Sequence, residues 1–203
     1  LFFQLIVNVT ALLLVLGGSF AGTELPLTVT QILWVNLIMD TFAALALASL
    51  PPSKEVMADK PRRLSDFIIT RGMAKGIAGV GFLFFIILFA MLIWFKQSAG
   101  GIDRIDLSVF FTTFVMIQFW NLLNAKTYAS EASAFKNLLS DKGLLMVLAI
   151  IIAGQWIIVT FGGDMFRTCP LPIMTWVQII VGTSIVFWAG EIYRFIARRI
   201  CKK

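Results

Sequence analysis

Charged residues are scarce in this chain, and histidine is absent. Lys, Arg, Asp and Glu make up only 14% of the 203 residues, whereas 59% are hydrophobic. A water-soluble domain cannot bury that apolar fraction, so the composition excludes one and indicates an integral membrane protein. We predict an all-α membrane protein with six transmembrane helices, because each apolar run is close to the roughly 20 residues that cross about 30 Å of hydrocarbon. The runs are residues 1–22, 28–50, 72–95, 107–125, 143–161 and 173–193.

The chain also lacks the usual parts of an enzyme active site. It has no His, no glycine-rich phosphate loop and no nucleophile paired with a base. We therefore expect any energy source for this protein to lie outside the residues shown. Leu1 starts an apolar run without an initiator Met or the basic head of a signal peptide, so we expect residue 1 to be a cut inside a longer protein.

Lys and Arg predict the topology, because cytoplasmic loops retain basic residues. If the first helix starts inside, all but Lys96, Arg104 and Arg167 of the 17 basic residues lie on the inner side, and both chain ends are cytoplasmic. Cys169 and Cys201 then fall on opposite membrane faces, which excludes a disulfide between them. The net charge of +6 arises at loop borders rather than in a stripe with interleaved aromatics, so we expect no nucleic-acid partner.

Asp40 is the only formal charge near the middle of a predicted span, and Asn36 precedes it by one helical turn. An ionised carboxylate at this depth costs at least ~2.5 kcal/mol, so it usually meets a cation or a proton. At i and i+4 the two side chains project from one helix face. Residues 23–27 alone join the first two helices, which predicts antiparallel neighbours, and counting ~1.5 Å per residue places Asn8 in the same middle zone. The sequence therefore predicts a site formed by Asn8, Asn36 and Asp40.

The predicted site offers only oxygen donors. Carboxylate and amide oxygens suit hard cations, and no thiolate or imidazole is placed near them, which argues against copper and zinc. Calcium, manganese and an alkali ion remain open. The side chains supply about four donors against the 6 to 8 that calcium takes, so waters or an upstream helix would complete the site. In the purely structural alternative Asp40 stays protonated and only hydrogen-bonds Asn36 or Asn8; a carboxyl that alternates between metal-bound and protonated states would carry protons in the opposite direction.

Other polar segments allow two interpretations each. Gln118, Asn121 and Asn124 form a stripe on the fourth predicted helix, which either joins helices by hydrogen bonds or brings Gln118 to the ion site. The long polar loop 51–71 is either a solvated connector or a docking surface for a cytoplasmic domain. The predicted organisation is an ion-site helical hairpin over 1–50, the cytoplasmic loop 51–71, and a four-helix support region over 72–203 with a basic cytoplasmic tail.

Several segments resemble the membrane domain of P-type calcium pumps, most closely the plasma-membrane type and its bacterial relatives. The resemblance covers nearly the whole chain as helices five to ten of a ten-helix membrane domain. It is carried by the segments QLIVNV (4–9), LWVNLIMDT (33–41), ALALA (44–48) followed by Pro51-Pro52, and FVMIQFWNLLNA (114–125).

The resemblance implies a role for each candidate residue. Asn36 and Asp40 would belong to the calcium site nearer the cytoplasmic half, completed by a glutamate and backbone carbonyls of an absent fourth helix, with Asn8 close by. Sarcoplasmic-reticulum-type pumps hold a second calcium with glutamates at positions matched here by Ala11 and Gln118. Neither residue carries charge, so we expect one calcium per cycle and Gln118 as a neutral ligand at most.

The resemblance further implies that ATP, magnesium and the phosphorylated aspartate belong to absent cytoplasmic domains, so this fragment alone should be inactive. Its partners would be the lipid bilayer and the rest of the same pump, with loop 51–71 touching the phosphorylation domain. The expected location is the plasma (inner) membrane, as a multi-pass protein. Two alternatives are a secretory-pathway-type pump that moves calcium and manganese, and a non-transporting membrane scaffold whose polar residues only join helices.

Overall fold

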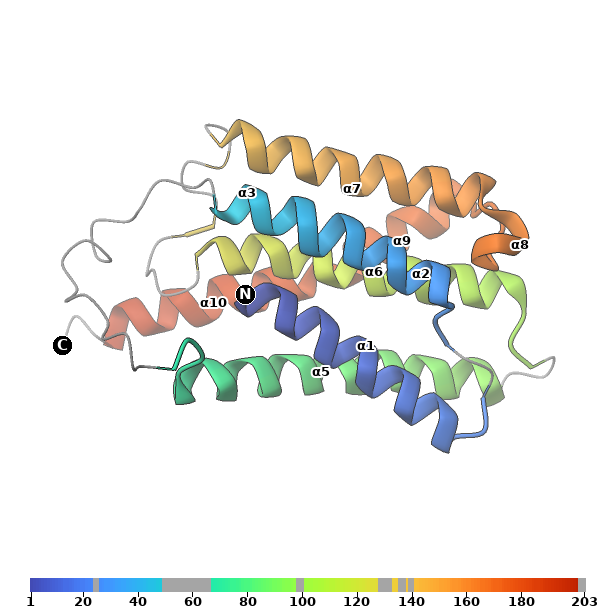
Figure 1. Ribbon diagram of the computed structural model, residues 1–203, viewed down its shortest axis with the longest axis horizontal. Helices are drawn as coiled ribbons and strands as arrows, with labels where there is room; N and C mark the ends of the chain where they lie inside the picture. Colours follow the sequence, from blue (N-terminus) through green and yellow to red (C-terminus); the bar gives the residue numbers. More distant parts are fainter. Residues whose placement is uncertain are drawn as a thin grey trace.

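The computed structural model describes residues 1–23, 26–48, 67–97, 101–127, 133–134, 138 and 141–200. Within these residues the chain forms helices and no strand, as predicted, and the long helices run along one common direction (Figure 1). The helices are α1 (Phe2–Phe20), α2 (Val29–Val35), the π-helix η1 (Asn36–Ala43), α3 (Ala44–Ala48), α5 (Arg71–Gln97), α6 (Arg104–Lys126), α7 (Lys142–Phe161), α8 (Gly163–Phe166), α9 (Ile173–Thr183) and α10 (Ile185–Ile200).

Each predicted apolar run coincides with a helical segment. By length and composition, five described segments could cross a membrane: α1, α5, α6, α7 and the stretch Ile173–Ile196 of α9 and α10. The remaining predicted span, residues 28–50, corresponds to α2, η1 and α3, which follow one another directly. The π-helix η1 divides this span into two α-helical pieces. Most of the predicted cytoplasmic loop, residues 51–66, lies outside the described residues, and so does Cys201.

Local sequence signals explain where two helices begin. Thr28 caps α2 in a capping box, because its Oγ1 accepts from the Gln31 N–H at 3.2 Å while Gln31 Oε1 accepts from the Thr28 N–H at 2.8 Å. Asp103 and Asp106 form the same arrangement at the start of α6. Between α8 and α9 the chain reverses at Arg167, whose φ of 49° lies in the left-handed region. These residues fix the helix starts and the turn at one end of the bundle.

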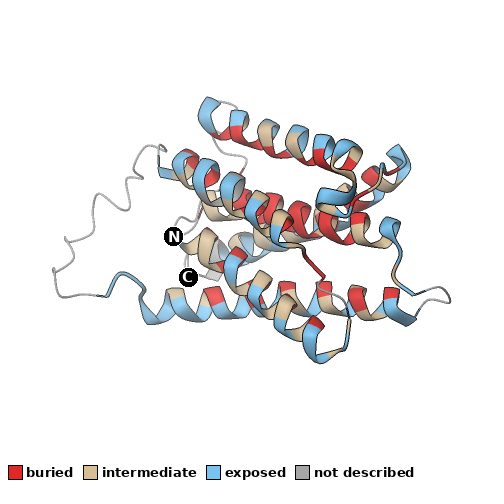
Figure 2. Cartoon of the chain, turned by 45° about the vertical axis from the view of Figure 1, so that its right-hand side comes forward, coloured by how far each residue is buried: buried red, intermediate tan, exposed pale blue. Residues whose placement is uncertain are grey.

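Helix α6 is the centre of the bundle. In the most apolar stretch of α6, 67% of the residues are buried. The corresponding fraction is 17% to 39% in the other four segments that could cross a membrane. Phe110, Phe111 and Phe114 are fully buried in it, and in Figure 2 the buried residues lie on the faces that the helices turn toward one another. Lipid is as apolar as these side chains, so close packing rather than exclusion of water holds the helices together.

Helix α1 packs along α5 by means of glycines. A Cβ added to Gly17 would meet the Phe85 ring, and one added to Gly81 would meet Val9. The α2–η1–α3 segment packs instead on α7. It runs in the opposite direction to α1 (Figure 1), as predicted. We also predicted that α1 and this segment are neighbours, but no extensive contact between them is found among the described helices. The glycines let α1 approach α5 so closely that α5 becomes its main partner.

We call the two ends of the bundle the Pro26 end and the Lys126 end, after residues that lie there. At the Lys126 end, Lys126 Nζ of α6 lies 2.6 Å from a carboxylate oxygen of Asp141, which precedes α7. Arg194 and Glu191 of α10 form a second ion pair at 2.8 Å. Helix α6 runs from the Pro26 end to the Lys126 end, and α7 runs back.

Candidate ion-binding site

The segment that contains Asn36 and Asp40 is a π-helix, η1, between α2 and α3. π-helical segments are rare and frequently occur at functional sites. Their i→i+5 hydrogen bonds replace the α-helical ladder, and where the α-helical pattern resumes one carbonyl is passed over. At that boundary the Ala44 N–H bonds the Thr41 carbonyl, only three residues back. Such a segment can offer backbone oxygens to a cation in addition to its side chains.

Asn36 is half-buried at the first position of η1, and Asp40 follows four residues later in the same π-helix. The side chains of residues 38–40 lie outside the described part of the chain. The structure therefore places Asp40 by its backbone alone, and the predicted pairing of its carboxylate with Asn36 stays a prediction.

Asp40 and Gln118 lie at a similar depth in the bundle. Trp34 of α2 packs on Gly154 of α7, and Gly154 lies about 20 Å along α7 from the Lys126 end. Asp40 is six residues beyond Trp34, which brings its backbone to about 10 Å from that end. Gln118 precedes Lys126 by eight residues, or about 12 Å along α6. The polar stripe of α6 therefore reaches the level of η1.

Gln118 has no exposed surface. Its Oε1 accepts from Asn121 Nδ2 at 3.3 Å, and its Nε2 has no hydrogen-bond partner among the described residues. A buried amide N–H without a partner requires an explanation, such as an ordered water that accepts from it. Asn124 serves another purpose, because its Nδ2 donates to the Val186 carbonyl of α10 at 2.9 Å. The stripe predicted from the sequence thus divides into an interior pair and a residue that joins two helices.

Asn8 lies on the exposed side of α1, which it shares with Leu12 and Leu16. The buried side of α1 carries Ile6 and Thr10 instead. Within the described residues, Asn8 is therefore not enclosed in the interior that holds Gln118.

Two polar features at buried positions were not indicated by the sequence. Gln155 of α7 is fully buried, and neither its Oε1 nor its Nε2 has a partner in the described part of the chain. Gln31 of α2 is only 2% exposed, and its Nε2 donates to the Phe166 carbonyl of α8 at 2.8 Å. The only available signal was a single glutamine within an apolar run, which gives no indication of the helix it faces.

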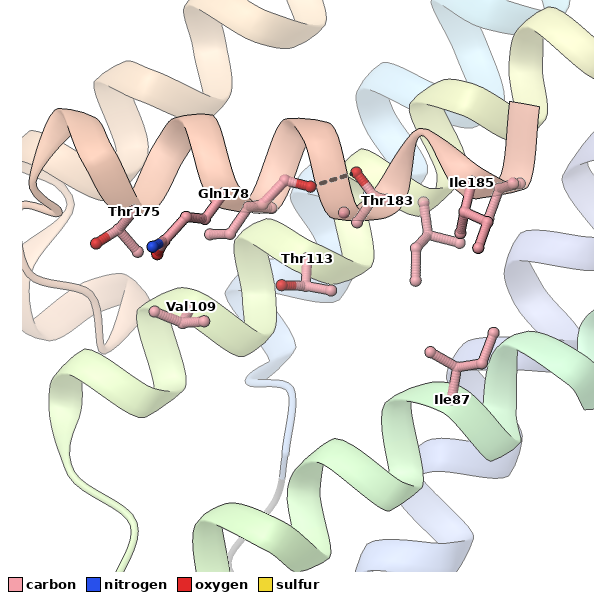
Figure 3. Close-up of a pocket in the computed structure, with 11 residues that line it drawn as sticks. Ile87, Val109, Thr113, Thr175, Gln178, Thr183 and Ile185 are labelled. Atoms are coloured by element: carbon pink, nitrogen blue, oxygen red, sulfur yellow. Dashed lines mark hydrogen bonds between the residues drawn. The ribbon is translucent and has the colours of Figure 1, made fainter. Parts of the chain in front are cut away.

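A groove of about 330 Å³ lies between α5, α6 and the α9–α10 segment, and Figure 3 shows the residues around it. Its lining is largely apolar, and the polar side chains in it are Thr113, Thr175, Gln178 and Thr183. None of the four predicted site residues lines this groove. It is therefore separate from the candidate ion site.

No three His, Cys, Asp or Glu side chains gather as metal ligands would, within the ranges that the structure describes. A cation at η1 would therefore depend on Asp40, on amide and carbonyl oxygens, and on donors from outside the described residues. Amide and carbonyl oxygens are ligands that calcium accepts.

Known proteins show where this chain fits. Residues 24–196 match the family model "Cation transporting ATPase, C-terminus". Plasma membrane calcium-transporting ATPase 3 of Homo sapiens is 34% identical over 201 residues, which cover 94% of this chain and 16% of that protein. Plasma membrane calcium-transporting ATPase mca-1 of Caenorhabditis elegans is 33% identical with the same 94% and 16% coverage. Plasma membrane calcium-transporting ATPase 2 of Oreochromis mossambicus is 34% identical, over 94% of this chain and 18% of its own length.

The chain thus spans less than a fifth of the length of these relatives. The family model covers the helices that carry Asn36, Asp40 and Gln118, but not α1 with Asn8, which precedes residue 24. The alignment to the human relative covers 94% of the chain. A bacterial origin stays a prediction. The chain belongs to the cation transporting ATPase C-terminal family, as its resemblance to the membrane domain of P-type calcium pumps implied.

Proposed function

We propose that this chain is the ion-translocating membrane portion of a calcium-exporting P-type ATPase. The observation that carries the proposal is that the π-helix Asn36–Ala43 contains Asp40, the one acidic residue predicted at mid-membrane depth. A charge and an interrupted hydrogen-bond ladder are both costly in a membrane, because each needs polar partners. A bound cation satisfies both. Membership of the family, and similarity to plasma membrane calcium-transporting ATPases, support the same function.

Asn36 and Asp40 are the central ligands of the proposed site. They supply a carboxylate and an amide oxygen from η1, and a carbonyl that the π-helical pattern passes over is a further hard donor. Gln118 is a candidate fourth ligand, since it is buried at a similar depth and its Nε2 lacks a partner among the described residues. If oxygen and nitrogen are exchanged in the carboxamides of both Gln118 and Asn121, their mutual hydrogen bond is kept. The Gln118 atom without a partner is then Oε1, which can bind a cation.

Asn8 is the ligand that most depends on other parts of the pump. It lies on the exposed side of α1, together with Leu12 and Leu16. We propose that membrane helices outside this chain cover this side of α1 and supply the acidic and carbonyl oxygens that complete the site. Loop 51–71 would contact the cytoplasmic domains of the same protein.

The proposed site holds one calcium per cycle. A second calcium would need further negative charge, and Ala11 and Gln118 supply none. When calcium leaves, Asp40 would take up a proton, because an unpaired carboxylate in a low-dielectric site favours its neutral form. Calcium export would therefore be accompanied by proton movement in the opposite direction.

The energy source and the location follow from the same proposal. ATP and magnesium would act in cytoplasmic domains outside this chain, and the isolated fragment would not hydrolyse ATP. The protein would reside in the plasma membrane, or in the inner membrane of a bacterium, with both ends of this chain in the cytoplasm. The Lys126 end of the bundle is then the inner end, because it also carries the basic C-terminal helix α10.

Asp40→Asn in the full-length pump tests the proposal. The variant should lose calcium-dependent phosphorylation by ATP and keep calcium-independent phosphorylation by inorganic phosphate, because only the ion site is damaged. Asp164→Asn is a matched control on α8 at the Pro26 end, and it should behave like the unmodified pump. Unchanged calcium dependence in Asp40→Asn would remove Asp40 from the site.

The same assay separates the alternatives. Manganese that supports phosphorylation as well as calcium does would favour a pump of the secretory-pathway type, because hard donors do not distinguish these ions cleanly. A protein that binds neither ion, and whose Asp40→Asn variant is simply more stable, would be a scaffold.

A further inference from the structure

The start of the proposed ion-site helix is attached to the short helix α8 by two side chains. Thr30 Oγ1 donates to the Met165 carbonyl at 2.7 Å. Gln31 Nε2 donates to the Phe166 carbonyl at 2.8 Å. Both acceptors belong to the last turn of α8, whose carbonyls have no helical donors. Two neighbouring residues of α2 thus satisfy the exposed carbonyls of a helix 135 residues away in the sequence.

Gln31 forms a hydrogen bond at both ends of its carboxamide in this arrangement. Its Oε1 accepts from the Thr28 N–H in the capping box and its Nε2 donates to α8, while the side chain is only 2% exposed. One hydrogen bond at each end of the carboxamide fixes its orientation, and a buried amide held in this way keeps its surroundings in one geometry. Thr28 Oγ1 also lies 2.9 Å from Thr30 Oγ1, which joins the two attachments into one network.

The rest of the same helix is held differently. Trp34 packs on Gly154 of α7, and α3 also packs on α7. The π-helix η1 between them also contacts α7, but the regular hydrogen-bond ladder of the helix is interrupted there. A helix bends most readily at such an interruption, because one hydrogen bond of the α-helical pattern is already lost there.

We infer that Thr30 and Gln31 are positioning residues that keep the outer end of the ion-site helix fixed on α8 throughout transport, so that η1 absorbs the movement during calcium binding and release. This inference rests on the proposed function. It also means that calcium does not leave between α2 and α8. The release path lies on another side of η1.

A reversible cross-link tests whether the attachment is permanent. Thr30→Cys and Met165→Cys are introduced together into the full-length pump with Cys169→Ala, and a short bifunctional thiosulfonate joins them. Met165 is 68% exposed, so the reagent can reach it. Calcium uptake into sealed vesicles should be the same before cross-linking, after cross-linking and after reduction.

Each outcome has a distinct meaning. Uptake that disappears on cross-linking and returns on reduction would overturn the inference, because the two helices would then have to separate. An unmodified pump that moves no calcium, although it is folded and is phosphorylated by inorganic phosphate, would instead overturn the proposed function itself.

Substitution tests the positioning role independently. Gln31→Leu keeps the volume but removes both hydrogen bonds, and the apparent calcium affinity should fall by roughly five- to tenfold, as expected for one lost buried network. Phosphorylation by inorganic phosphate and the amount of folded pump should not change, whereas a merely structural role would lower both. Thr30→Val should give a smaller change in the same direction.

Gln178→Leu is the matched control, because Gln178 is an exposed glutamine of α9 that lines the groove between α5, α6 and the α9–α10 segment. It should leave the calcium affinity unchanged. An equal loss in Gln178→Leu, or no loss in Gln31→Leu, would contradict the positioning role.

Discussion

Arg194 of α10 donates to Asn124 Oδ1 of α6 at 3.0 Å, and Gly190, one turn earlier on α10, lies directly against the same carboxamide. The Asn124 Nδ2 in turn donates to the Val186 carbonyl at 2.9 Å. The Asn124 carboxamide is therefore held from both sides by α10. This close contact joins the central helix to the last helix at the Lys126 end, and it makes the size of residue 190 critical.

We predict that Gly190→Ala destabilises the protein by about 1 to 3 kcal/mol, the usual cost of overpacking. A Cβ at this position would overlap the Asn124 carboxamide, which its hydrogen bonds prevent from moving aside. Gly182→Ala is the control, because nothing lies within 4 Å of a Cβ there, and it should be neutral or slightly stabilising. Thermal unfolding in detergent measures both. Equal unfolding temperatures for the two variants would contradict the packing argument.

The ion pair of Arg194 and Glu191 should show strong coupling. Their side chains are only 11% and 16% exposed, and Glu191 Oε1 also accepts from the Ala134 N–H at 2.7 Å. Arg194→Met alone should cost about 3 kcal/mol, because it leaves a largely buried carboxylate without its cation. The double variant with Glu191→Gln should recover part of that loss. Strictly additive losses in this double-mutant cycle would mean that the pair does not interact.

The contact between Gly154 and Trp34 should affect the ion site from a distance. A Cβ on Gly154 would collide with the Trp34 ring, so Gly154→Ala should shift α2 immediately before η1. We expect the apparent calcium affinity to fall by about threefold, equivalent to less than 1 kcal/mol. Gly79→Ala is the control, since a Cβ there meets nothing within 4 Å. A normal affinity in Gly154→Ala would show that η1 tolerates movement of α2.

Gln155 differs from Gln31 in having no hydrogen bond to lose among the described residues. Both of its side-chain polar atoms are buried without a partner among the described residues, so Gln155→Met removes an unsatisfied amide at nearly constant volume. We expect a gain of about 1 kcal/mol in the free energy of unfolding. Thermal unfolding checks this expectation. A loss of similar size would mean that Gln155 has a partner, such as a buried water.

The number of calcium ions per pump follows from the neutral residues Ala11 and Gln118. We predict one calcium bound per phosphorylation site, measured with radioactive calcium against the amount of phosphoenzyme. Gln118→Glu adds a carboxylate near the level of η1, and it should raise calcium affinity or allow a second ion to bind. Two ions per site in the unmodified pump would contradict the argument from charge.

The sequence by itself determined the fold class and the positions of the helices. Runs of about 20 apolar residues can only be stable in lipid as helices, because every backbone N–H and C=O must be satisfied internally. The residues that cap α2 and α6, Thr28 with Gln31 and Asp103 with Asp106, also act over one turn and follow known sequence rules. The family likewise follows from local segments such as residues 33–41, because it depends on residue identity rather than on geometry.

Only the tertiary structure decided which helices are neighbours. Apolar residues surround a membrane helix on all sides, so hydrophobic periodicity could not identify α6 as the central helix or pair α1 with α5. The pairing depends on where Gly17 and Gly81 allow close approach. The π-helix was likewise invisible, because its sequence has the composition of an ordinary apolar helix. The attachment of Gln31 to α8 joins residues 135 positions apart, and no local pattern can report a contact that exists only when the chain is folded.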